Sequence, residues 1–290
     1  MIFNSVGGKM NGRIVQLEKI NEFKKKLFLE EKSERTIDKY IRDCKSFCQF
    51  CGEKEIKRET VLNYKQMLIE KGYKLCTVNS YISSINSLFK HLGWDDFRLR
   101  QYRVQKSFYR PEEKELCLEE YKLLCRTAEK SNRENLSLIM QTIASTGIRI
   151  GELHFITVEA VIAGTADVCK KSKIRSIFIP ETLKKKLMKY MDKMNISSGP
   201  VFLNSHGSPV KRSVIWNQMK HLCRKCNINP MKVYPHNLRH LFARQFYCLD
   251  KDIAKLADIL GHSSINTTRL YIVSTGTEHR KLIEKMNMTL

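Results

Sequence analysis

Apolar side chains in residues 14–93 recur at intervals of three and four positions, the spacing that gathers them on one face of an α-helix. Ser33 and Thr36 offer caps for one helix, and Gly72 and Gly93 are suited to end two others. The pattern predicts four helices, at residues 14–30, 34–51, 57–71 and 76–92. We therefore expect a small helical bundle with basic residues between its apolar positions.

Helical periodicity stops in residues 94–114, where basic residues are interleaved with aromatic ones. Such a run is typical of a linker that follows a phosphate backbone. Its candidates for DNA contact are Arg98, Arg100, Arg103, Lys106 and Arg110. We place the domain boundary near Ser107. The predicted organisation is a flexible leader at 1–13, a helical domain with its linker at 14–107 and a second domain at 108–290, which includes a C-terminal tail at 272–290.

The second domain combines helical stripes with short segments in which β-branched residues alternate with polar ones. Helices are predicted at residues 118–130, 134–145, 181–194, 210–226, 236–249, 252–260 and 264–271. A further helix is expected from Arg149, after a break at Thr146-Gly147, and a weak amphipathic helix at 277–286. Strands are predicted at 157–162, 165–169 and 174–179. The fold class is therefore mainly α with a small antiparallel β-sheet.

Basic residues exceed acidic ones by a wide margin: 52 Lys and Arg against 30 Asp and Glu give a net charge of +22. Such an excess indicates a polyanionic partner, most often nucleic acid, although a merely basic, solvated surface remains the alternative. No apolar run approaches the length of about 18 residues that spans a bilayer, and the N-terminus lacks the apolar core of a signal peptide. We expect a cytoplasmic protein without membrane contact.

Two Cys-x-x-Cys pairs, one ending at Cys51 and one formed by Cys223 and Cys226, have a spacing that zinc sites use. However, Cys44, Cys48 and Cys51 continue a helical apolar stripe, and the second pair continues another. Core packing explains both spacings. We therefore expect reduced thiols and no bound metal.

The candidate chemistry lies near the C-terminus, in His-x-x-Arg-His at His236, Arg239 and His240, followed by His262 and Tyr271. On a helix, positions three and four apart share a face, so the first three side chains lie together. Imidazoles, a guanidinium and a phenol without a carboxylate pair suit phosphate chemistry, in which an anion is bound and a hydroxyl attacks it. Tyr271 also fits a buried aromatic position, and His262 also fits a turn.

Five elements together resemble the tyrosine recombinase (phage integrase) family. They occur in family order: Thr146-Gly147-Ile148-Arg149-Ile150-Gly151-Glu152-Leu153, a lysine-rich turn, the His-x-x-Arg-His sequence, Leu260-Gly261-His262 and Thr267-Thr268-x-x-Tyr271. The resemblance implies a catalytic domain of this family. The four-helix part is similar, in pattern alone, to the helical SAM-like core-binding domain of its simpler two-domain members.

The resemblance implies a role for each matching residue. Tyr271 would attack a DNA phosphodiester, which leaves a 3′-phosphotyrosyl link and a free 5′-hydroxyl. Arg149 and Arg239 would bind the non-bridging oxygens, and His262 would donate a hydrogen bond to the same phosphate. His236 would assist proton transfer at the tyrosine.

The remaining site residues support this set. Lys170 would protonate the leaving 5′-oxygen, with Lys171 and Lys173 as rivals on the same turn, because a strand residue aims its side chain by parity. Glu152 would orient Arg149, and His240 would have a structural role in the core. Lys173 and Arg175 are assigned to DNA contact.

The implied function is a site-specific DNA recombinase or integrase that acts in integration, excision or resolution of a mobile element, without metal, cofactor or ATP. Its partner would be double-stranded DNA with an inverted-repeat core site, bound by a homotetramer whose C-terminal tail docks on a neighbouring protomer. Two alternatives stay open. One is a type IB topoisomerase-like enzyme, and the other is a catalytically idle DNA-binding protein of the same fold.

Overall fold

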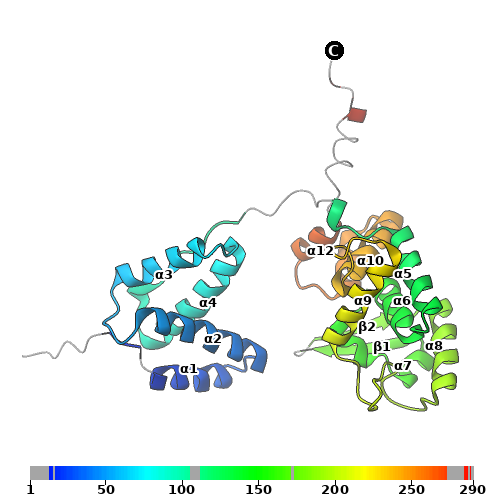
Figure 1. Cartoon of the computed structure of the whole chain (residues 1–290), viewed down its shortest axis with the longest axis horizontal. Helices are drawn as coiled ribbons and strands as arrows, with labels where there is room; N and C mark the ends of the chain where they lie inside the picture. Colours follow the sequence, from blue (N-terminus) through cyan, green and yellow to red (C-terminus); the bar gives the residue numbers. More distant parts are fainter. Residues whose placement is uncertain are drawn as a thin grey trace, which may run out of the picture. The chain divides into compact units, whose positions relative to one another are not determined.

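The computed structural model describes residues 13–15, 17–104, 112–170, 173–272, 284–286 and 288. Contacts group the chain into two compact units, residues 1–106 and 107–290 (Figure 1). Both units are built from helices, and the second also contains a two-stranded antiparallel sheet. The predicted fold class is therefore confirmed.

The first unit contains four helices, α1 (Leu17–Leu29), α2 (Glu34–Cys51), α3 (Arg58–Glu70) and α4 (Leu75–Leu92), close to their predicted bounds. Ser33 caps α2 by accepting a hydrogen bond from the backbone N–H of Thr36. The apolar faces meet in one core, in which the ring of Phe47 lies edge-on to those of Tyr64 and Phe89, with centroids 5.1 and 5.6 Å apart. Aromatic packing thus joins α2, α3 and α4.

The segment that follows α4 is fixed to that helix. After a 3₁₀ turn, η1 (Asp95–Phe97), the side chain of Asn86 bonds both backbone groups of Leu99, at 2.8 Å each. Asn79 bonds both backbone groups of Tyr102 in the same way, also at 2.8 Å. Of the predicted DNA contacts, Arg98, Arg100 and Arg103 are exposed on this segment, whereas Lys106 and Arg110 lie outside the described residues.

The second unit packs its helices around α6 (Glu134–Thr146), which is buried along most of its length. The other elements are η2 (Glu112–Lys114), α5 (Leu118–Lys130), η3 (Ile150–Phe155), α7 (Val158–Ala163), β1 (Thr165–Lys170), β2 (Lys173–Phe178), α8 (Glu181–Met194), α9 (Arg212–Cys226), α10 (Pro235–Asp250), α11 (Ile253–Leu260) and α12 (Ile265–Ile272). A smaller apolar cluster of Ala243, Leu256, Leu260 and Tyr271 joins α10, α11 and α12.

One predicted strand is wrong, because residues 157–162 form α7 instead. Thr157 caps this helix by accepting from the N–H of Ala160 at 3.2 Å, and Gly164 ends it. Val158 and Val161, three positions apart, are buried, whereas Ile162 is 58% exposed. Burial thus follows a helical rather than a strand period, although β-branched residues favour strands.

Two further predicted segments lie outside the regular helices and strands or outside the described residues. The helix expected from Arg149 is the 3₁₀ helix η3, with Arg149 as its N-cap residue. The predicted amphipathic helix at 277–286 lies outside the described residues except for its last three positions, as does most of the predicted leader. In the part of the chain that the structure describes, no helix is long and apolar enough to cross a membrane.

We expect Thr157→Ala to lower the free energy of unfolding by about 1 kcal/mol, because the first turn of α7 loses its side-chain acceptor. Thr157→Ser keeps the hydroxyl and serves as the matched control. Urea unfolding of the full chain, followed by circular dichroism, measures both variants. Equal stability of the alanine variant and the wild type would show that the cap does not stabilise this helix.

Candidate active site

Arg239, on the first turns of α10, is the most deeply buried charged group of the site, at 1% exposure. Its Nη1 donates to the carbonyl of Gly147 at the end of α6, and its Nη2 donates to the carbonyl of Leu260, at 2.6 Å, at the end of α11. Burial, followed by the charge of Arg149, lowers the pKa of Arg239 to about 10. The guanidinium therefore stays positive at neutral pH.

Gly147 makes this arrangement possible. It ends α6 in the left-handed region, at a φ of +65°, where glycine is favoured. A Cβ at this position would also lie 2.6 Å from the ring of Phe242. The Thr-Gly break in the sequence is therefore a requirement for placing the Gly147 carbonyl against Arg239.

The first turn of α10 is held by side chains that reach back to the start of the unit. The amide nitrogen of Asn237 donates to the carbonyl of Lys114, at 2.9 Å, and to that of Lys232, at 2.6 Å. Two turns further along, Arg244 pairs with Glu115. These bonds fix the end of the helix that presents His236 and Arg239.

Arg149 lies beside the buried carboxylate of Glu152. Its Nη1 donates to Glu152 Oε1 at 3.2 Å, and its Nη2 donates to the carbonyl of Gly261 at 3.4 Å. Glu152 is 2% exposed, whereas the side chain of Arg149 is 32% exposed. The geometry suits the orienting role predicted for Glu152, because the ion pair fixes one edge of a guanidinium that still reaches solvent.

His262 bridges Arg239 and α12. Its Nε2 lies 3.1 Å from Arg239 Nη2, and its Nδ1 lies 2.8 Å from Thr268 Oγ1. A guanidinium can only donate, so Nε2 accepts and the ring proton sits on Nδ1, which donates to the threonine. Burial and three nearby arginines, with Arg239 the strongest, lower the pKa of His262 to about 4. The imidazole is therefore neutral at pH 7.

Tyr271, on α12, lies among three imidazoles. Its hydroxyl is 3.3 Å from His236 Nε2, and its ring stacks on that of His240 with centroids 4.1 Å apart. The ring of His262 is 4.9 Å away, and the guanidinium of Arg239 lies 5.8 Å from the tyrosine ring. A neutral His236 can accept the phenolic proton at this distance, and His240 supports the ring from the core side.

The structure thus brings together seven of the predicted site residues: Arg149, Glu152, His236, Arg239, His240, His262 and Tyr271. Lys170 ends β1 and is paired in register with Lys173, but the side chains of both lie outside the described structure, as does Lys171. The choice among these lysines stays a prediction.

Arg175 and Thr268 have roles in this geometry that the sequence did not reveal. Arg175, assigned to DNA contact, turns inward and pairs with Glu152, and Thr268 holds His262. Strand alternation could have indicated that Arg175 turns inward, because Arg175 shares a side of β2 with buried Ile177 while Ile174 is exposed.

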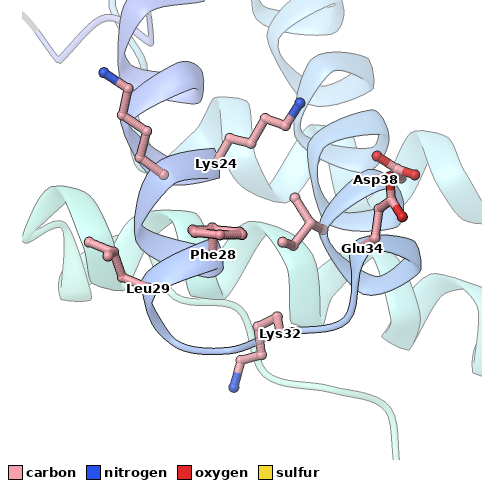
Figure 2. Close-up of a pocket in the computed structure, with 8 residues that line it drawn as sticks. Lys24, Phe28, Leu29, Lys32, Glu34 and Asp38 are labelled. Carbon is pink, nitrogen blue, oxygen red and sulfur yellow. The ribbon is translucent and has the colours of Figure 1, made fainter.

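Elsewhere in the described residues, a further site would require a cluster that could bind a metal ion or a groove lined by catalytic side chains. No three His, Cys, Asp or Glu side chains of the described ranges gather as they would around a metal ion. A groove of about 700 Å³ lies between α1 and α2, where Figure 2 shows Phe28 and Leu29 on α1 and Glu34 and Asp38 on α2. It is open and apolar, with lysines such as Lys32 at its edge, and its lining contains no histidine, tyrosine or cysteine.

We expect acidification to weaken the fold through His262. Its pKa is about 4 in the folded chain, below the ordinary value of 6.5, so the unfolded chain binds more protons between these values. The stability contributed by the neutral ring is complete above about pH 6.5 and is lost as the pH falls toward 4.

His262→Gln should therefore show a smaller loss of unfolding free energy between pH 7 and pH 5 than the wild type. Urea unfolding at both pH values measures this, and an NMR titration should find the His262 midpoint near 4. His221→Gln, at an exposed position, is the matched control. A His262 midpoint at or above 6.5 would contradict the geometry described above.

The chain is similar to known proteins over most of its length. The profile of the phage integrase family matches residues 114–278, and that of the family's N-terminal SAM-like domain matches residues 20–97. Tyrosine recombinase XerA of Pyrococcus furiosus is 28% identical over 288 residues, covering 96% of this chain and 97% of the relative. Tyrosine recombinase XerD of Staphylococcus haemolyticus is 29% identical over 289 residues, covering 92% and 98%.

Solved structures show the same fold. The crystal structure of XerA recombinase matches with a TM-score of 0.53 and 25% identity, over 94% of this chain and 99% of that one. The Tn1549 transposon integrase in complex with transposon right end DNA matches at 0.70 and 17%, over 93% and 99%. A lambda integrase tetramer bound to a Holliday junction matches at 0.71 and 18%, over 90% and 78%. The chain therefore belongs to the phage integrase family of tyrosine recombinases.

Proposed function

We propose that this chain is a site-specific DNA recombinase that cuts and rejoins DNA through a 3′-phosphotyrosyl intermediate, with Tyr271 as the nucleophile. The observation that carries the proposal is the position of the Tyr271 hydroxyl, 3.3 Å from His236 Nε2 and on a ring that also lies against His262 and Arg239. A nucleophile, a proton acceptor and fixed cations thus converge at one place, which phosphoryl transfer requires.

In the cutting step, the Tyr271 oxygen bonds to phosphorus while its proton passes to His236 Nε2. The bond from phosphorus to the 5′-oxygen breaks, and that oxygen takes a proton from Lys170. Arg149 and Arg239 bind the non-bridging oxygens, which carry more negative charge in the transition state than in the ground state. The phosphotyrosyl bond conserves the energy of the phosphodiester, so attack by another 5′-hydroxyl completes strand exchange without ATP.

His262 must change its bonding to take part. In the structure its Nε2 accepts from Arg239, whereas a contact with phosphate oxygen requires a proton on that nitrogen. A bound phosphate offers Arg239 Nη2 another acceptor, and its negative charge raises the pKa of the imidazole. Binding of DNA thereby favours the form of His262 that donates to the scissile phosphate.

Double-stranded DNA is the proposed partner. The net charge of +22 and the exposed Arg98, Arg100 and Arg103 suit a phosphate backbone. Among the structural relatives, the Tn1549 integrase is described with transposon DNA and the lambda integrase as a tetramer on a Holliday junction. By analogy we propose an inverted-repeat core site bound by a homotetramer, with residues 14–107 as core-binding domain and 108–290 as catalytic domain.

Three finer parts of this proposal rest on the family resemblance. They are action on a mobile element, DNA contact by Lys106, Arg110 and Lys173, and docking of the tail at 272–290 on a neighbouring protomer. A recombinase would protect an inverted-repeat site in a footprint and exchange strands between two duplexes. A topoisomerase-like enzyme would instead relax supercoiled DNA without site preference.

The nucleophile is tested with a nicked suicide duplex whose site is first selected by binding of the full chain to random-sequence DNA. We expect wild type and the control Tyr247→Phe to form a covalent protein–DNA adduct and Tyr271→Phe to form none, because phenylalanine lacks the attacking oxygen. An adduct from Tyr271→Phe would assign the attack to another residue. Tight binding without an adduct from wild type would favour an idle DNA-binding protein.

The leaving-group acid is tested with a duplex in which sulfur replaces the bridging 5′-oxygen. A thiol has a pKa of about 8.5, far below that of an alcohol, so it leaves without an acid. We expect Lys170→Ala to cleave the oxygen substrate slowly and the sulfur substrate at the wild-type rate. If the sulfur substrate instead restores the cleavage rate of Lys171→Ala or Lys173→Ala, and not that of Lys170→Ala, the lysine at that position is the acid.

A further inference from the structure

Arg175 lies in the middle of β2, opposite Val168 of β1, on the hairpin that also carries the lysine turn. Its neighbours Ile174 and Ser176 are exposed, whereas the Arg175 side chain is only 14% exposed. Strand parity directs it toward the interior of the second unit. A long, charged side chain in this position requires partners, because an unpaired buried charge is costly.

Its partners are the groups that hold the two phosphate-binding arginines. Arg175 Nη2 donates to Glu152 Oε2 at 2.6 Å, while the other oxygen of that carboxylate accepts from Arg149. Arg175 Nη1 donates to the carbonyl of Leu260 at 2.6 Å, and the same carbonyl accepts from Arg239 Nη2 at 2.6 Å. One guanidinium thus links the anchor of Arg149 to an anchor of Arg239.

The turn that carries His262 closes over the same side chain. Gly261, at a φ of +61°, has no Cβ, and a Cβ there would lie 2.6 Å from both Cδ and Nη1 of Arg175. The backbone therefore approaches the guanidinium as closely as a glycine permits. Arg175 connects three parts of the site: the Glu152 carboxylate, the end of α11 and the turn before His262.

The directions of its donors argue against a phosphate contact. Both terminal nitrogens bond groups of the chain itself, and little of the side chain reaches solvent. Bidentate guanidinium geometry is needed to reach Glu152 and Leu260 at once, which the point charge of a lysine does not provide.

We propose that Arg175 is a positioning residue for strand cleavage, which aligns Arg149 and Arg239 through Glu152 and the Leu260 carbonyl without touching DNA. The proposal rests on the function proposed above. It predicts that Arg175 affects the rate of the chemical step and leaves DNA affinity unchanged, because the groups it aligns act on the transition state.

The test measures two quantities on the suicide duplex: the dissociation constant, and the single-turnover rate of adduct formation at saturating protein. For Arg175→Lys we expect the rate to fall about 10- to 100-fold, the scale of a misplaced catalytic group. The dissociation constant and its salt dependence should not change. Arg126→Lys, at an exposed position on α5, is the matched control and should behave as wild type.

A second variant displaces the guanidinium without removing it, and a double-mutant cycle tests whether Arg175 acts through Glu152. Gly261→Ala should displace the guanidinium without removing it and give the same slow cleavage with unchanged affinity, and thermal unfolding reports any fold defect. In a Glu152→Gln background, Arg175→Lys should lose most of its effect, because the shared carboxylate has gone. Full additivity of the two changes would overturn action through Glu152.

The remaining outcomes separate the two proposals. Weaker binding by Arg175→Lys, with a salt slope reduced by about one, would make Arg175 a phosphate contact and overturn the positioning role. An unchanged cleavage rate in a folded Arg175→Lys variant would overturn that role alone. A wild-type chain that forms no adduct would overturn the proposed function and, with it, the positioning role.

Discussion

The buried guanidinium of Arg239 is the interaction on which the catalytic unit depends. Among the described residues, no carboxylate forms an ion pair with this guanidinium. Its hydrogen bonds go instead to the carbonyls of Gly147 and Leu260. Carbonyl dipoles stabilise a cation without cancelling its charge, so the charge stays available to an anion. The same two bonds join the end of α6 to the end of α11, so the position of the cation and the packing of the helices are one constraint.

Around this cation, the site has more positive than negative charge. Arg149, Arg175 and Arg239 converge, and Glu152 is the carboxylate that pairs with the first two. Burial and repulsion together hold the pKa of His262 at about 4, so the imidazole adds no further charge to the site at neutral pH. Electrostatic preorganisation of this kind costs stability in the free protein and favours an incoming phosphate.

Much of the fold could be predicted from the sequence because most helices carry one apolar face and end at a cap or a glycine. The exception, α7, is short and rich in valine, so its composition favours a strand while its tertiary contacts select a helix. That His236, Arg239 and Tyr271 lie close together could be predicted, because motif and spacing agree there. Strand alternation could indicate that Arg175 faces inward, but it could not indicate the partners, because Glu152 and Leu260 lie 23 and 85 positions away in sequence and only folding brings them together.

Tyr271, the proposed nucleophile, is carried by a short helix with little apolar support. Helix α12 has eight residues, of which Thr268 and Tyr271 are buried. They contact His262, His236 and His240, and Tyr271 also belongs to the small apolar cluster around Leu260. The position of Tyr271 therefore depends on the same imidazoles for which we propose roles in phosphate binding and proton transfer. An element with so little burial belongs to the less stable part of a fold, so a change at the phosphate site can move the tyrosine before it disturbs the core.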